Sequence, residues 1–191
     1  MNTTHEATSH LNGVDVERLM GTIKAIEQDP SLGHFEFRAQ NRWIHGGHNQ
    51  SVIQGFYGAG QEDTSRRQAF VLDNDEPDVL LGKDNGANPA EYVLHALAGC
   101  MTTTIAYHAA ARGIRIQALE CTLSGDIDLR GMLGISRDVP AGYTNIRAEF
   151  RVKGDLTHEQ LEELRAIAVS YSPVHYTVSN PVRLDVQVTA K

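Results

Sequence analysis

Residues 88–113, NPAEYVLHALAGCMTTTIAYHAAARG, contain both ends of one long helix and its apolar middle. Asn88 is a preferred N-cap residue, Pro89 suits the first helical turn, and Glu91 stands at the position of a capping-box carboxylate. The closing glycine is a typical helix stop. Between Glu91 and Arg112 there is no charged Asp, Glu, Lys or Arg. A helix that is apolar all round is buried or spans a membrane. Its His and Thr residues disfavour lipid, so we expect the central helix of a core.

Cys100 lies in the middle of this helix. Cysteine is among the most buried residue types, so packing alone is one interpretation. The helix dipole favours a thiolate near the N-terminus of a helix and not at its centre. A reactive Cys100 therefore requires a cation or a base from another element.

Length and charge restrict the classes of function. A chain of 191 residues suits one core, and its net charge of −7 argues against nucleic acid or an anionic membrane as a partner. Two cysteines, Cys100 and Cys121, do not make a disulfide framework in a chain of this size. The first residues, MNTTHEATSH, lack the basic start and apolar run of a signal peptide. We therefore expect a cytoplasmic protein.

The first third of the chain predicts a helix followed by strands. Residues 14–28 carry apolar side chains at helical spacing, and Asp-Pro ends the pattern. Residues 34–43 and 51–60 predict a hairpin around a Gly-Gly turn, and a third strand is expected near 68–72. The acidic run 73–78 lacks the spacing of a calcium loop, and we interpret it as solvated.

His45 and His48 flank the Gly-Gly turn. Two imidazoles without further ligands at a recognisable spacing do not make a zinc site. We therefore expect no metal and no other cofactor.

The second half of the chain predicts an antiparallel sheet with one wet face and an amphipathic helix. Residues 114–131 and 143–154 alternate apolar and polar side chains. A capping-box pattern follows, and Ser172 with the next proline can start a further short helical turn. Residues 179–188 alternate again, which predicts a closing strand. The expected inner stripe of the amphipathic helix is Leu161, Leu164, Ala168 and Tyr171. The order of elements indicates the α+β class.

Three stretches together resemble the OsmC/Ohr superfamily of osmotically induced and organic-hydroperoxide-resistance proteins. They are NPAEYVLHALAGCMTTTIAYHAAARGI, GDIDLRG and SPVHYTVSNPV, which span roughly residues 80 to 190. The resemblance implies an OsmC-like fold, with antiparallel sheets around a long buried central helix, in an intertwined homodimer. The chain would then be one domain, 1–191. Its parts would be a helical extension (1–30), N-terminal strands (34–72), the central helix (88–113), and C-terminal strands with the amphipathic helix (115–191).

The resemblance also implies a chemistry centred on Cys100. In the peroxidases of this family the central-helix cysteine attacks a hydroperoxide and becomes a sulfenic acid, and a second cysteine condenses with it. Here the position of that second cysteine is matched by Ser172. A hydroxyl cannot form a disulfide, so a thiol from solution or from Cys121 would have to react instead.

The resemblance further implies an arginine that lowers the pKa of the thiol and a glutamate that holds this arginine. In the peroxidases of the family this glutamate directly follows the proline, where the present chain has Ala90, with Glu91 one residue later. On an ideal helix Glu91 is turned by about 180° from Cys100, whereas position 90 lies within about 80° of it. Glu91 is thus a candidate both for the catalytic glutamate and for a helix cap, and the angle favours the cap.

The resemblance places the family's thiolate-stabilising arginine in the first hairpin, where Arg42 is the first candidate and Arg38 the second. Thr103 and Thr104 share the helix face of Cys100 and are candidates for lining a substrate pocket or for packing.

Two functions follow as hypotheses. In the first, the chain is a thiol-dependent peroxidase with one essential cysteine, a peroxiredoxin-type antioxidant that reduces organic hydroperoxides with an external thiol as reductant. In the second, the same homodimer binds a small hydrophobic or thiol-reactive molecule without turnover. The retained Cys100 favours the first hypothesis, whereas the serine at 172 and the displaced glutamate favour the second.

Overall fold

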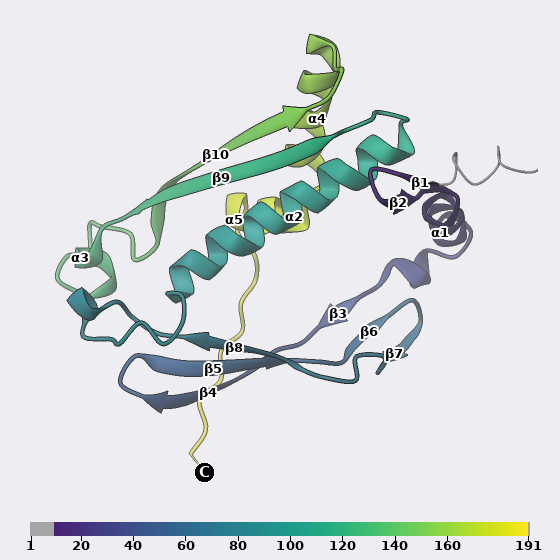
Figure 1. Ribbon diagram of the computed structural model, residues 1–191. Helices are drawn as coiled ribbons and strands as arrows, with labels where there is room; N and C mark the ends of the chain where they lie inside the picture. Colours follow the sequence, from purple (N-terminus) through teal and green to yellow (C-terminus); the bar gives the residue numbers. More distant parts are fainter. Residues whose placement is uncertain (1–9, 191) are drawn as a thin grey trace, which may run out of the picture. The chain divides into compact units, whose positions relative to one another are not determined.

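The computed structural model describes residues 10–190 (Figure 1). It contains helices and antiparallel sheets in separate runs along the chain, which agrees with the predicted α+β class. The elements are β1 (His10–Leu11), β2 (Val14–Asp15), α1 (Val16–Gln28), η2 (Pro30–Gly33), β3 (Glu36–Phe37), β4 (Gln40–His45), β5 (His48–Ile53), β6 (Phe56–Gly58), β7 (Gln61–Asp63), β8 (Phe70–Asn74), η3 (Asp78–Leu80), α2 (Pro89–Ala111), β9 (Ala118–Ile127), α3 (Leu129–Met132), β10 (Tyr143–Lys153), α4 (His158–Tyr171) and α5 (Pro173–Ser179).

Chain contacts divide the protein into two compact units. One unit comprises the described residues up to Val14 together with those from Leu94 onward, and the other comprises Asp15–Val93. Most of α2, with β9, β10, α4 and α5, belongs to the first unit, and β3 to β8 belong to the second. Because the chain crosses between the units twice, the prediction of one domain over 1–191 stays a prediction.

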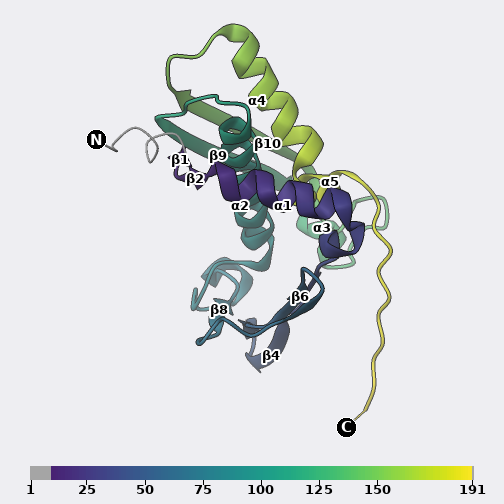
Figure 2. The ribbon, with the colours of Figure 1, turned by 90° about the vertical axis from the view of Figure 1, so that its right-hand side faces the viewer.

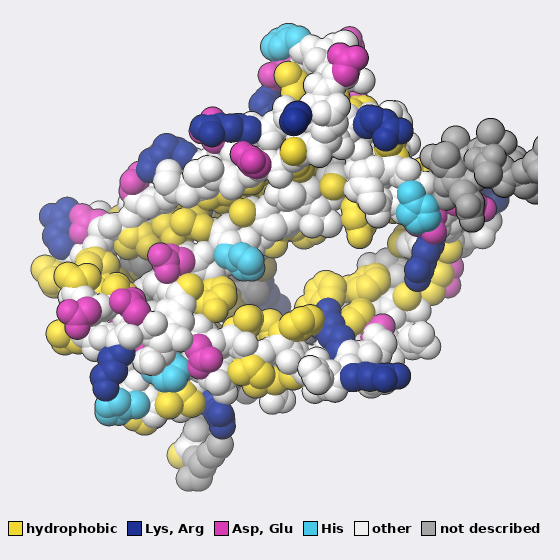
Figure 3. All heavy atoms as spheres, viewed as in Figure 1, with side chains coloured by type: hydrophobic (Ala, Val, Ile, Leu, Met, Phe, Trp, Pro, Cys, Tyr) yellow, Lys and Arg dark blue, Asp and Glu magenta, His cyan; other side chains and the backbone are white. Residues whose placement is uncertain are grey.

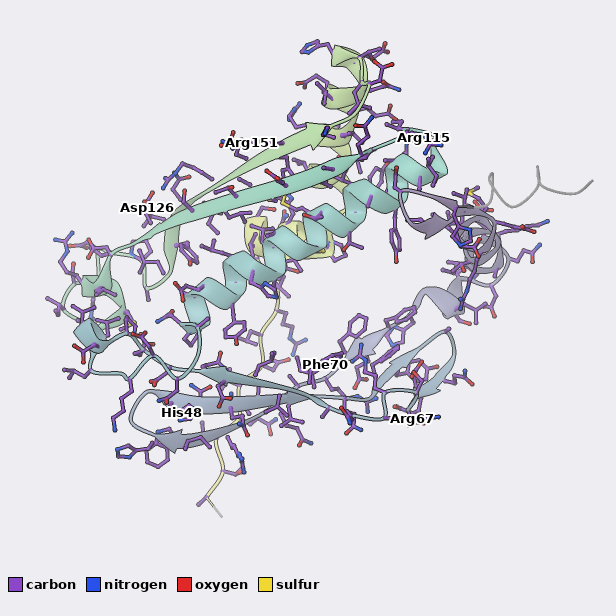
Figure 4. The ribbon with its side chains drawn as sticks, viewed as in Figure 1. His48, Arg67, Phe70, Arg115, Asp126 and Arg151 are labelled. Atoms are coloured by element: carbon purple, nitrogen blue, oxygen red, sulfur yellow. The ribbon has the colours of Figure 1, made fainter. Side chains whose placement is uncertain are left out.

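The first unit is a β9–β10 hairpin with helices on one face (Figure 1). The two strands pair in a long antiparallel register in which, for example, Cys121 lies opposite Phe150. Their burial alternates residue by residue along β9, so the predicted half-buried sheet is confirmed. Asp126 and Arg151 lie on the side turned away from α2 (Figure 4).

The core of this unit lies between α2, α4 and the hairpin. Leu164 and Ile105 are among its most deeply buried side chains, each about 2% exposed. Each such side chain stabilises the fold by roughly 1.5–3 kcal/mol. The buried cluster consists of Leu97, Met101, Ile105, Ala109, Ile114, Leu164, Ile167 and Ala168.

The capping predictions in this unit are confirmed. Thr157 and Gln160 form the reciprocal capping box of α4, and Ser172 with Pro173 starts α5. The predicted inner stripe of α4 is partly wrong. Leu161 and Tyr171 are exposed, and Ile167 is buried instead, because the buried face is centred one residue position further round the helix.

Within the first unit, the central helix is buried along one side and exposed along the other. Its buried residues lie at helical spacing from Leu97 to Ala110. The opposite side is exposed yet uncharged, and it includes Val93, Ala96, Gly99, Thr103 and Tyr107. Within the described residues of the first unit, apolar packing therefore covers one side of α2 only.

The second unit consists of α1 and two small sheets, β3-β6-β7 and β4-β5-β8. The turn at Gly46-Gly47 joins β4 to β5, as predicted, and β8 pairs with β5. The single strand expected over residues 51–60 is broken after Ile53. Its second part forms β6, and the chain then turns back as β7, which pairs with β6. Gly60 adopts a left-handed backbone, which lets this tight turn form. Figure 3 shows many hydrophobic side chains at the surface of these sheets, and Phe37 and Phe70 are more than half exposed.

The N-terminal helix is confirmed as α1, with Asp15 as its N-cap. None of its residues is buried, and Met20 and Ile23 are exposed. The predicted apolar stripe is therefore only partly covered within the described chain, with Val16, Leu19 and Ile26 half-buried.

The acidic run 73–78 was expected to be solvated, and this expectation is wrong for Asp75, which is buried. Its carboxylate is buried and accepts hydrogen bonds from the backbone amides of Glu76, Lys83 and Asn85 and from the Asn85 side chain. Burial opposes ionisation of this carboxyl, but the hydrogen bonds outweigh burial and lower the pKa of Asp75 to about 2. The carboxylate thereby holds together the loop that leads to α2.

The closing strand predicted for residues 179–188 does not form. After α5 the chain continues as an extended segment without regular secondary structure (Figure 2). In the described residues no strand pairs with it, and a strand without a neighbour has no hydrogen bonds to hold it. Its alternating apolar side chains, Val182, Leu184, Val186 and Val188, are 58% to 93% exposed.

Candidate functional site

The structure brings Cys100 and Ser172 together in the first unit. Cys100 lies on α2 and is half-buried, whereas Ser172 is only 1% exposed at the junction of α4 and α5. The Ser172 hydroxyl oxygen is 3.2 Å from the Cys100 sulfur, across 72 residues of sequence. This distance is within the range of a hydrogen bond to sulfur.

The capping of α5 orients the Ser172 hydroxyl. The backbone N–H of His175 donates to Ser172 Oγ at 3.2 Å. A backbone N–H can only donate, so one lone pair of the oxygen is used there, while the hydroxyl proton stays available for Cys100. Pro173 pre-sets the first turn of α5 and helps to fix this geometry.

A group of side chains ties α2 to the end of α4, directly before Ser172. The His108 and Tyr171 rings stack with their centroids 4.6 Å apart. Arg112 donates to His108 Nδ1 at 2.9 Å and pairs with Glu163 at 3.0 Å. An arginine has only donors, so His108 Nδ1 must be unprotonated. Partial burial, together with the Arg112 charge, lowers the pKa of His108.

The other candidates on α2 occupy different environments. Thr103 and Thr104 lie one turn along from Cys100, Thr103 exposed and Thr104 half-buried. Glu91 accepts a hydrogen bond from the Asn88 backbone N–H at 2.9 Å, while the Asn88 side chain accepts from Ala90 N at 2.7 Å. Glu91 thus supplies the predicted capping-box carboxylate, while the Asn88 side chain caps the amide of Ala90 rather than that of Glu91.

The two candidate arginines lie in the unit that does not contain Cys100. Arg42, on β4, donates to the Gln50 side chain at 2.9 Å. Arg38 pairs with Glu62 and with Glu36. A role for either arginine at Cys100 stays a prediction.

Cys121 faces the core side of β9, opposite Phe150. Burial raises the pKa of the Cys121 thiol, which disfavours its reactive thiolate. Both cysteines are free thiols.

The histidines of the first hairpin do not gather metal ligands. His48 instead contacts Asp73 at 2.8 Å, and this contact lowers the pKa of Asp73. Across residues 10–190, no group of three or more His, Cys, Asp or Glu side chains is placed to hold a metal ion. Within the same described range, no helix has the length and apolar character needed to cross a membrane.

Two features of this site were missed from the sequence. Ser172 was interpreted as a helix cap and as the replacement of a cysteine, but its hydrogen bond to Cys100 was not foreseen. The stack of His108 on Tyr171 carried no sequence signal either, because it joins residues on separate helices. Two sequence signals marked Ser172: the Ser-Pro helix start and its match to the position of the family's second cysteine.

Comparisons with known proteins agree on the fold. The family model described as OsmC-like protein matches residues 82–187, more than half of the chain. No curated protein matches the sequence.

Solved structures match at low sequence identity. An OsmC-like protein of Mycoplasma pneumoniae is 17% identical with a TM-score of 0.59, covering 75% of this chain and 87% of that one. An organic hydroperoxide resistance protein of Legionella pneumophila is 17% identical with a TM-score of 0.52, covering 74% and 88%. An OsmC-like protein of unknown function from Vibrio cholerae is 14% identical with a TM-score of 0.51, covering 74% and 92%. At these identities the structures show a shared fold.

Proposed function

Because the chain belongs to the OsmC-like protein family, we propose that it is a thiol-dependent peroxidase that reduces organic hydroperoxides through Cys100. The observation that carries the proposal is that Cys100 is half-buried and that the buried Ser172 hydroxyl lies 3.2 Å from its sulfur. A sulfur held in a protected but not sealed position beside a hydrogen-bond donor suits a reactive thiolate. The printed name of the Legionella pneumophila structure, an organic hydroperoxide resistance protein, supports the same class of substrate.

The reaction runs in two stages. The Cys100 thiolate attacks the outer oxygen of the hydroperoxide ROOH, an S–O bond forms, the O–O bond breaks, and the alkoxide takes a proton to leave as ROH. Cys100 is then a sulfenic acid. Because Ser172 cannot form a disulfide, an external thiol condenses with the sulfenic acid and releases water. A second external thiol then frees Cys100 and leaves as the external disulfide.

The remaining candidates have supporting roles in this proposal. Arg42, with Arg38 as the second choice, stabilises the thiolate and the developing charge on the leaving oxygen. Thr103 and Thr104 line the approach to the sulfur. Glu91, which caps α2, has the structural role rather than that of an arginine partner.

The test is consumption of cumene hydroperoxide with dithiothreitol or dihydrolipoamide as reductant. We expect turnover in the wild type, none in Cys100→Ser, and near wild-type turnover in Cys121→Ser, the matched control that removes the chain's other thiol. Turnover that survives in Cys100→Ser would refute the proposal. An inactive wild type would favour the alternative, an OsmC-like protein that binds a small molecule without turnover.

We also propose that the working form is a homodimer. In the single chain, the uncharged exposed side of α2 and the alternating segment Val182–Val188 present uncovered apolar surface. Monomers seldom leave large apolar patches exposed, and a second copy of the chain offers both a matching helix face and sheet edges for the segment. Light scattering after size exclusion should give twice the mass of the chain. Deletion of residues 181–191 should shift the protein toward monomer, and an unchanged dimer would exclude the segment from the interface.

The same proposal places the protein in the cytoplasm. Both cysteines are free, and thiols persist in that reducing compartment, where the external thiols needed for turnover are also abundant.

A further inference from the structure

We propose that Ser172 is a hydrogen-bond donor that activates Cys100, so that the position acts on the reactive sulfur rather than merely lacking a second thiol. This inference rests on the proposed function, because it assigns a further residue to the same reaction. Its basis is the 3.2 Å approach of the Ser172 hydroxyl to the Cys100 sulfur.

The direction of this hydrogen bond follows from the chemistry of the partners. A thiolate sulfur has no proton, so in the reactive form only the hydroxyl can donate. The hydroxyl oxygen already accepts from the His175 backbone N–H. Donation into one lone pair polarises the O–H bond and strengthens its donation to sulfur. The two successive hydrogen bonds, from the His175 amide to the Ser172 hydroxyl and from this hydroxyl to the Cys100 sulfur, therefore stabilise the thiolate.

Burial makes this donor effective. Ser172 is 1% exposed, so water does not compete for its proton. The hydroxyl is held by the first turn of α5, on a rotamer that the cap itself requires. Pre-organised donors lose little entropy when charge develops beside them. Ser172 is thus already positioned before a hydroperoxide arrives.

The Ser172 hydroxyl also has a role after Cys100 is oxidised to the sulfenic acid. After oxygen transfer, Ser172 can still donate to the sulfenate but cannot replace its oxygen, so Cys100 waits for a thiol from solution. A hydroxyl at this position therefore combines activation of the sulfur with dependence on an external reductant.

The test is the pH dependence of Cys100 alkylation by iodoacetamide, followed by peptide mass spectrometry so that Cys121 is scored separately. A hydrogen bond to a charged group is worth about one to two pH units in such a profile. We expect Ser172→Ala to move the midpoint upward by about one pH unit and to raise the plateau rate about threefold, because a more basic thiolate is a better nucleophile. Ser172→Thr, which restores a hydroxyl, should return the midpoint toward the wild type.

The matched control is Thr157→Ala. Thr157 caps α4 with the same 3.2 Å hydrogen bond, from the Gln160 N–H, so its loss weakens a neighbouring helix without touching the sulfur. The control should leave the midpoint unchanged. If Ser172→Ala does not fold, Ser172→Cys with both thiols reduced replaces it and should give a smaller upward shift, since a thiol is the weaker donor.

An unchanged midpoint in Ser172→Ala, or an equal shift in Thr157→Ala, would overturn the inference. The assay uses no peroxide, so its result is separate from that of the proposed function. Peroxidase turnover with an unchanged midpoint would retain the enzyme and reject the role of Ser172. A shifted midpoint without turnover would retain the hydrogen bond and reject the enzyme.

Discussion

Substitution of Ser172 by cysteine should create a disulfide with Cys100. The two side-chain atoms are 3.2 Å apart, and a disulfide bond of about 2.05 Å requires only a small further approach. The resulting bond would close a loop across 72 residues of sequence.

The expected stabilisation follows from this loop length. The chain-entropy relation gives about 4.4 kcal/mol at 25 °C for a loop of this size, as an upper limit that native strain reduces. For a chain of this length, 1 kcal/mol corresponds to about 2–4 °C in Tm. We therefore expect oxidised Ser172→Cys to melt roughly 5–15 °C above the same protein when reduced.

The assay compares the oxidised and the reduced state of the same variant. Both states lack the serine cap, so its loss does not contribute to the difference in Tm between them. Ser172→Cys in a Cys121→Ala background is oxidised with one equivalent of cumene hydroperoxide. Free thiols, intact mass and Tm are then measured before and after reduction. The wild type, treated identically, should show no such reversible shift. If both thiols stayed free, or if the Tm of the two states agreed, position 172 at the start of α5 would not lie beside Cys100, and the reasoning would be refuted.

Further predictions concern the core, the helix contact and the acidic loop. Ile105→Ala should lower the free energy of unfolding by about 3 kcal/mol, because it leaves a cavity in place of a fully buried side chain. Thr103→Ala, on the exposed side of the same helix, should change this free energy little. Equal urea midpoints for the two variants would contradict the prediction. The lowered pKa of His108 means that the unfolded chain binds more protons. This contribution to stability is complete above about pH 6.5 and is lost as pH falls toward the lower folded pKa; His108→Gln should flatten that part of the urea-midpoint profile, and parallel profiles would count against it. Asp75, with a pKa of about 2, should stabilise the protein fully above about pH 4 and lose this effect as pH falls through 2. Asp75→Asn can place its NH2 group, a donor, against the backbone N–H groups of Lys83 and Asn85, and it should therefore lower Tm at pH 7 by several degrees in calorimetry. An unchanged Tm would show that the hydrogen bonds to the Asp75 carboxylate do not stabilise the protein.

Many of the helices and strands were predictable because their signals are local. The start of α2 depends on Asn88, Pro89 and Glu91, which interact within one helical turn. The alternation of β9 and β10 and the capping box of α4 likewise depend on residues two or three positions apart. Such short-range patterns survive any change in the rest of the fold.

Local pattern failed where a neighbour decides the outcome. The segment after α5 alternates as a strand does, but within the described chain it has no partner, and its Val188 is 93% exposed. Asp75 belongs to an acidic run and is nevertheless buried, because the backbone amides of Lys83 and Asn85, eight and ten residues away, converge on it together with the adjacent amide of Glu76. The central helix has no charged residue between Glu91 and Arg112, yet within the described residues of the first unit only one of its sides is buried.

The sequence by itself determined most of the helices and strands, because helical caps and apolar periods act between residues a few positions apart, and it also indicated the OsmC-like family and a mid-helix cysteine. Only the tertiary structure decided that Ser172 meets Cys100 and that Tyr171 stacks on His108. These contacts depend on how α4 and α5 pack against α2 through the buried cluster. Packing is a property of many side chains at once, and no spacing along the chain encodes a 3.2 Å approach between residues 72 positions apart.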